Sequence, residues 1–83
     1  MSMDYRYQVA SDIRRDGLGV ELVGDNQVLA EIFRCDADNS LTLSVFGQDI
    51  PFIYVEKLVR MARSELTEFE DGSPLPEQLE IKE

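Results

Sequence analysis

The sequence predicts an α+β fold, in which an antiparallel β-meander of three to four strands is followed by one C-terminal helix on one face (β-β-β-β-α). Between residues 18 and 46, three short runs carry apolar residues at every second position, which is the period of a half-buried strand. Between residues 52 and 69 the apolar residues recur at steps of three and four, the period of an amphipathic helix. The 83 residues suffice for one domain.

The N-terminal run alternates apolar and polar side chains, with Met3, Tyr5, Tyr7 and Val9 on one side. This alternation predicts a first strand. Residues 10–17 are polar and end in Gly17, so we expect them to form a connection.

Three further strands are predicted at residues 18–23, 28–35 and 41–46, separated by turn-forming residues at 24–26 and 36–39. A four-residue loop at 36–39 would place Ile32 opposite Leu43 and Ala30 opposite Val45. Both pairs put apolar side chains on one face, as cross-strand neighbours require.

The loop at residues 24–26 has the same constraint. A three-residue loop would place Leu22 opposite Val28 and Val20 opposite Ala30, so that all three strands share one apolar face. A loop of two or four residues would bring Val20 opposite Glu31. We therefore expect the odd-numbered loop.

The helix is expected to begin near residues 49–51, because Pro51 suits a first turn whose N–H groups have no intrahelical partner. Gly72 and Pro74 lie beyond it, where a helix should have stopped. The predicted core has two parts. The sheet part is Leu18, Val20, Leu22, Val28, Ala30, Ile32, Leu41, Leu43 and Val45, and the helix part is Val55, Leu58, Val59, Ala62, Leu66 and Phe69.

We divide the chain into a domain at residues 1–69 and an acidic tail at residues 70–83. The tail holds two of the three prolines and five of the 17 acidic side chains. This composition predicts a mobile segment, although Leu75, Leu79 and Ile81 leave room for weak docking.

The net charge of -9 disfavours contact with phosphate backbones and anionic lipid headgroups. We therefore expect no nucleic-acid partner and no membrane partner, and the charge permits a basic protein partner. The single cysteine, Cys35, excludes a disulfide within the chain and fits a reducing cytoplasm. Residues 1–9 do not resemble a signal peptide, and no apolar run approaches the length of a membrane span.

Histidine is absent, which removes the commonest general base and the commonest zinc ligand. The spacing of Asp36, Asp38 and Ser40 resembles the start of a calcium loop, but Leu41 and Gly47 stand where that loop needs Gly and Glu. Glu21 and Glu31, the carboxylates within strands, are expected to face solvent. The sequence therefore predicts no catalytic, cofactor-binding or metal-binding residue.

Apolar residues also occur where the pattern predicts solvent. We expect them to form an interaction surface, because contiguous exposed apolar patches usually mark contact sites. The candidate residues on the sheet are Val23, Leu29, Phe33 and Phe46, joined by Tyr5 and Tyr7, and those on the helix are Ile53, Tyr54 and Met61.

The segments at residues 15–22, 29–34 and 49–51 resemble short uncharacterised bacterial single-domain proteins over residues 15–66. The resemblance implies a bacterial cytoplasmic origin and carries over no activity or site residue. Three functional hypotheses remain open. The first is a non-catalytic interaction module that forms a homodimer, the second is an acidic inhibitor or immunity-type protein that binds a basic protein, and the third is a small ligand-binding or enzyme domain.

Overall fold

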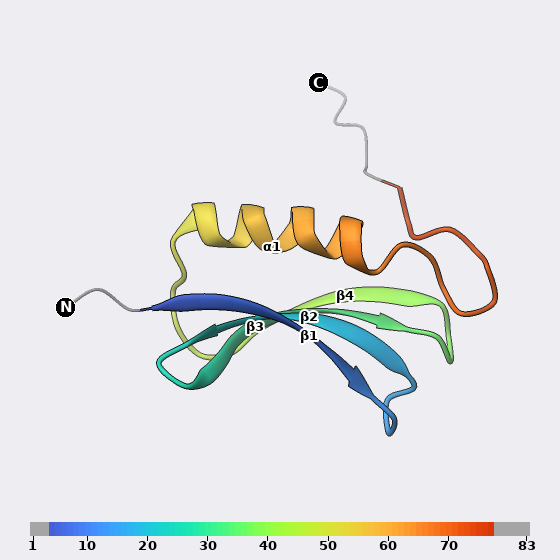
Figure 1. Cartoon of the computed structure of the whole chain (residues 1–83), viewed down its shortest axis with the longest axis horizontal. Coiled ribbons are helices and arrows are strands. Elements are labelled where there is room, and N and C mark those ends of the chain that lie inside the picture. The colour runs from blue at the N-terminus through green and yellow to red at the C-terminus, as the bar shows by residue number, and fades with distance from the viewer. Residues whose placement is uncertain (1–3, 78–83) are drawn as a thin grey trace.

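The computed structural model describes residues 4–77. Four antiparallel strands form one sheet in the order β1-β2-β3-β4, and one helix follows them, so the predicted fold class is confirmed. The helix lies along one face of the sheet (Figure 1). The strands are β1 (Tyr5–Asp12), β2 (Gly17–Gly24), β3 (Gln27–Cys35) and β4 (Ser40–Val45), and the helix is α1 (Phe52–Glu65).

Strand β1 is longer than expected, because it forms a regular hairpin with β2 that closes at Asp12 opposite Gly17. The Asp12 carboxylate accepts hydrogen bonds from the backbone N–H groups of Arg14 (3.0 Å) and Arg15 (3.2 Å), which fixes the turn. Residues 10–12 therefore belong to the strand rather than to the connection. Met3 lies outside the described residues.

The β2–β3 turn has two residues rather than three, with Gly24 opposite Gln27. Asp25 and Asn26 have φ values of 53° and 62°, which are typical of a type I′ hairpin turn. The turn matches the right-handed twist of the strands and tolerates Asp and Asn at positive φ.

A β-bulge compensates for the even-numbered turn. Leu29 is the extra residue of β3, and beyond it Leu22 pairs with Ala30 and Val20 pairs with Ile32. The predicted partners of Leu22 and Val20 are therefore wrong by two residues. Beyond the bulge the predicted common face survives, because the turn and the bulge each shift the register by one. Val28 precedes the bulge and pairs with Val23, outside the core cluster, so its predicted place on this face is wrong.

The β3–β4 register is confirmed. Ile32 lies opposite Leu43, Ala30 opposite Val45, and Cys35 opposite Ser40. Four residues separate these two strands, as expected.

The helix packs mainly on β2 and less on β3, with Leu58 and Ala62 on its buried side. A helix is about 10 Å across, so it covers about two strands spaced about 4.8 Å apart. The core assignment of Leu43, Val45 and Val59 is therefore wrong: 51%, 52% and 44% of these residues' surfaces are exposed. The principal core consists of Val20, Leu22, Leu29, Ala30, Ile32, Leu58, Ala62, Leu66, Phe69 and Leu75.

Residues beyond α1 fold back onto the end of the sheet. The Arg34 guanidinium donates hydrogen bonds to the carbonyl oxygens of Leu66 (2.8 Å) and Glu68 (2.7 Å), where a cation suits the C-terminal end of a helix. The backbone N–H of Glu70 donates to the Asp36 carboxylate (2.9 Å), and Leu75 is buried in the core. Part of the segment expected to be a tail, residues 70–77, thus contacts the domain. Leu79 and Ile81 lie outside the described residues.

The hydrogen bonds that Asp71 accepts within this segment and from Asn39 predict that the fold is sensitive to acid. Hydrogen bonds from Asn39, and then from Ser73, lower the pKa of Asp71 from 3.8 to about 2. Because the folded-state pKa is lowered, the stabilisation is present above about pH 4 and is lost as the pH falls toward about 2. Urea midpoints at about pH 5 and about pH 2.5 should differ less in Asp71→Asn than in the unaltered chain. Asp4→Asn, at an exposed site on the N-terminal side of β1, is the control, and an equal acid-induced drop in both variants would contradict the assignment.

No helix within residues 4–77 has the length and apolar character required to cross a bilayer.

Candidate interaction surface

The sheet face opposite the helix is less exposed than the sequence predicts. Val23, Leu29 and Phe33 are all buried, and Leu29 belongs to the core on the helix side because it occupies the bulge. The expected exposed apolar patch on this face is therefore absent among the described residues. Phe46 is half exposed.

Phe33 is covered by an arginine and two glycines. The Arg15 guanidinium carbon lies 4.0 Å from the centre of the Phe33 ring, in a cation–π contact. A side chain at Gly17 or Gly19 would meet this ring, since a Cβ atom added there would lie 2.5 Å from Phe33 Cζ and 3.2 Å from Phe33 Cδ1, respectively. The glycines thus make room for the aromatic ring.

The same arginine pairs with a buried carboxylate. Glu31 is 4% exposed, so the expectation that it faces solvent is wrong. Its two oxygens each accept a hydrogen bond of 2.9 Å from Arg15, and this contact raises the pKa of the arginine. Arg15 also lowers the pKa of Asp12 through a side-chain hydrogen bond. Glu31 therefore has a structural role: through Arg15, it holds the β1–β2 turn against the sheet.

Three tyrosines meet on the helix side of β1. The rings of Tyr5 and Tyr54 stack with centroids 4.0 Å apart, and the Tyr7 hydroxyl donates a 2.8 Å hydrogen bond to the Tyr54 carbonyl oxygen. Lys57 Nζ lies 5.1 Å from the centre of the Tyr7 ring. Burial raises the pKa of Tyr7. These aromatic residues therefore link α1 to β1 on the helix side of the sheet rather than join Phe33 and Phe46.

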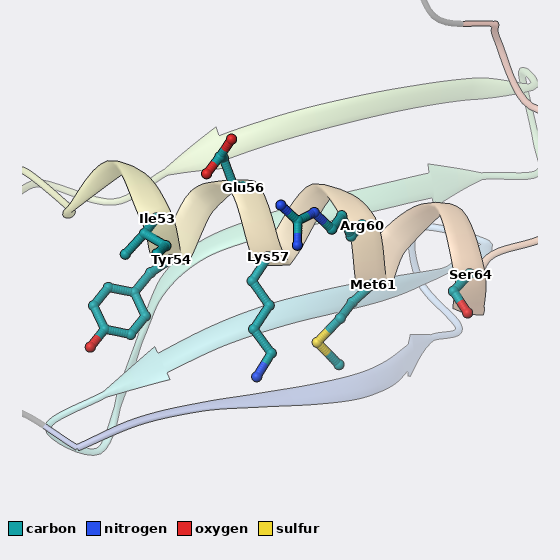
Figure 2. Close-up of a pocket in the computed structure, with 7 residues that line it drawn as sticks. All are labelled: Ile53, Tyr54, Glu56, Lys57, Arg60, Met61 and Ser64. Carbon is teal, nitrogen blue, oxygen red and sulfur yellow. The ribbon is translucent and has the colours of Figure 1, made fainter.

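An open hollow of about 630 Å³ runs along this side of α1. Tyr54, Lys57 and Met61 project toward β1 and β2, whereas Glu56 points to the opposite side (Figure 2). The lining residues are Ile53, Tyr54, Glu56, Lys57, Arg60, Met61 and Ser64. Of the predicted helix residues, Ile53 is exposed, and Tyr54 and Met61 pack partly against the core. Glu56 is the single carboxylate that lines the hollow.

Of the eight large apolar residues that are exposed within residues 4–77, four lie on β4 or on the side of α1 toward β4. Helical geometry places Phe52, Val55 and Val59 about 140–160° around the helix from Lys57, hence on the side of β4. Leu43 and Val45 lie on the helix face of β4, because their partners Ile32 and Ala30 are core residues. The exposed apolar residues on this side are Leu43, Val45, Phe52 and Val59. The sequence assigned three of these residues to the core, so it did not predict their exposure.

Strand β4 is also an open edge, since no strand within residues 4–77 pairs with its outer side. Its sequence, Ser-Leu-Thr-Leu-Ser-Val, contains no charge and no proline. The other edge strand, β1, carries Arg6 and Asp12, and such charges protect an edge from pairing with another chain. The two edges therefore differ in their protection.

Residues 4–77 contain no group of three or more His, Cys, Asp or Glu side chains that could hold a metal. The Cys35 thiol lies 3.4 Å from the Arg15 carbonyl oxygen, at the end of β3.

Comparisons of the chain with protein-family models, with curated proteins and with solved structures find no match.

Proposed function

We propose that this chain is a small non-catalytic protein-interaction module that self-associates through the edge of β4. The main support is the coincidence of an uncharged open edge with Leu43 and Val45, which are both half exposed. An apolar edge strand without protective charges is a template for strand pairing. We further propose a cytoplasmic location, which the single cysteine favours.

Charge supports β4 as the contact site. Two chains of net charge -9 repel each other over most of their surfaces, and β4 carries no charge. The neighbouring hollow on α1 is lined by Arg60 and Arg63 with the single carboxylate Glu56. Strand β4 itself thus adds no charge repulsion to the approach of a second copy.

Salt separates this proposal from the inhibitor hypothesis. Added salt screens the repulsion between two acidic chains, so the dimer should tighten or stay unchanged as the salt concentration rises. A complex with a basic protein should instead weaken, because its attraction is screened.

The proposal predicts the effect of a charge on the edge strand. The unaltered chain should be a dimer by light scattering, and Leu43→Glu should be a monomer because two carboxylates would be desolvated at the contact. Ile13→Glu is the matched control, since Ile13 is 95% exposed in the β1–β2 turn and its replacement adds the same charge. It should remain a dimer.

Either of two results would overturn the proposal. One is a strict monomer for the unaltered chain at concentrations up to about 1 mM, which corresponds to a contact weaker than about -4 kcal/mol. The other is an equal loss of self-association in both glutamate variants, which would assign the effect to net charge rather than to β4.

A further inference from the structure

The hydrogen-bonding groups on the free edge of β4 can be assigned from its pairing with β3. The backbone N–H of Phe46 donates to the Leu29 carbonyl oxygen at 2.9 Å, so Phe46 faces β3. Backbone groups alternate in direction along an antiparallel strand. Ser44, Thr42 and Ser40 therefore also direct their N–H and C=O groups toward β3, and the groups of Leu41, Leu43 and Val45 point outward.

The same three residues carry the apolar side chains of β4. Leu43 and Val45 lie opposite Ile32 and Ala30 on the helix face, and Leu41 shares this face by strand alternation. Outward backbone groups and helix-side apolar groups thus belong to one set of residues. A strand added at this edge must hydrogen bond to the outward backbone groups and also cover the apolar side chains. It can do both only if its own residues that point their backbone groups toward β4 carry apolar side chains on the helix face.

A second copy of β4 meets this condition. We propose that two chains pair β4 to β4 in antiparallel orientation about a twofold axis at Leu43. Leu43 then lies opposite the partner's Leu43, and Leu41 lies opposite the partner's Val45. The pairing joins the two sheets into one of eight strands with both helices on the same face. This inference rests on the self-association proposed above and specifies its register.

A parallel arrangement or a shift by one residue is less favourable. A twofold axis perpendicular to the sheet requires antiparallel strands, and closed twofold dimers are the commonest oligomers. A one-residue shift would place apolar side chains opposite Thr42 and Ser44 and would break the match of faces.

Disulfide trapping tests the register. In a Cys35→Ser background, Leu43→Cys should form a covalent dimer under mild oxidation, because hydrogen-bonded partners have Cα atoms about 5.5 Å apart. Thr42→Cys is the matched control. Position 42 would lie opposite the partner's Ser44. The Cα atoms of the two cysteines at position 42 would therefore be about 7–8 Å apart, which is too long for a disulfide. A mixture of Leu41→Cys and Val45→Cys chains should cross-link, and each alone should not.

The outcomes separate the register from the self-association. Trapping at Leu43 but not at Thr42, in a chain that is dimeric by light scattering, is the expected result. A dimer that cross-links at Thr42, or at none of these positions, would overturn the register and leave self-association standing. A monomer that traps at no position would overturn both. Circular dichroism of each cysteine variant checks that the fold is retained, which the half-exposed position of Leu43 favours.

Discussion

Truncation of Leu58 to alanine should cost about 3–4 kcal/mol of unfolding free energy, a large fraction of the ~5 kcal/mol at the lower end of the range for native proteins. Leu58 is fully buried in α1, and this helix packs mainly on β2, where Val20 and Leu22 are also fully buried. The surrounding strands are fixed by sheet hydrogen bonds, so the cavity would collapse only in part. Urea denaturation followed by circular dichroism measures the loss.

Leu43→Ala is the matched comparison, because it deletes the same atoms from a half-exposed site on β4. It should cost less than about 1 kcal/mol when the chain is dilute enough to be monomeric, since little apolar area is lost. Equal losses for the two truncations would show that the helix does not lie over β2 as described.

Gly17→Ala should cost about 3 kcal/mol, at the upper end of the range for overpacking. A Cβ at this position would lie 2.0 Å from the Arg34 carbonyl oxygen and 2.5 Å from Phe33 Cζ. The first neighbour is backbone of the adjacent strand, so relief requires β2 and β3 to separate. The second is an aromatic ring held under Arg15.

Gly72→Ala provides the control for this substitution. Gly72 has a φ of 89°, and a Cβ added there would have no neighbouring atom within 4 Å, so alanine adds backbone strain without a steric clash. We expect a cost of about 1–2 kcal/mol for that strain. If Gly17→Ala proves no more destabilising than Gly72→Ala in urea, the close contact of Phe33 with the glycine is wrong.

Local pattern was sufficient to predict several elements. The four strands, the loop at residues 36–39 and the β3–β4 pairs follow from alternation and turn residues. The β2–β3 register was missed because an odd loop and a two-residue turn with a bulge produce the same apolar face. Asp25 and Asn26 were the available signal, since both tolerate the positive φ of a type I′ turn.

The candidate site was harder to predict than the fold. Phe33 and Leu29 looked like surface residues from alternation alone, and Leu43 and Val45 looked like core. Phe33 is buried because Arg15 covers its ring, and Arg15 lies in the β1–β2 turn, distant from Phe33 in the sequence. Burial of Leu29 depends on the bulge. Exposure of Leu43 depends on how far the helix extends across the sheet.

By itself, the sequence determined that one apolar face of a four-stranded sheet would receive one amphipathic helix, because periodicity assigns each side chain to a face. The tertiary structure decided where on that face the helix lies. The tyrosines of β1 and the Arg34 contacts fix α1 over β2, and a helix covers only about two strands. Strand β4 is therefore left partly uncovered, so that Leu43 and Val45, beside the open edge that we propose as the contact site, are half exposed.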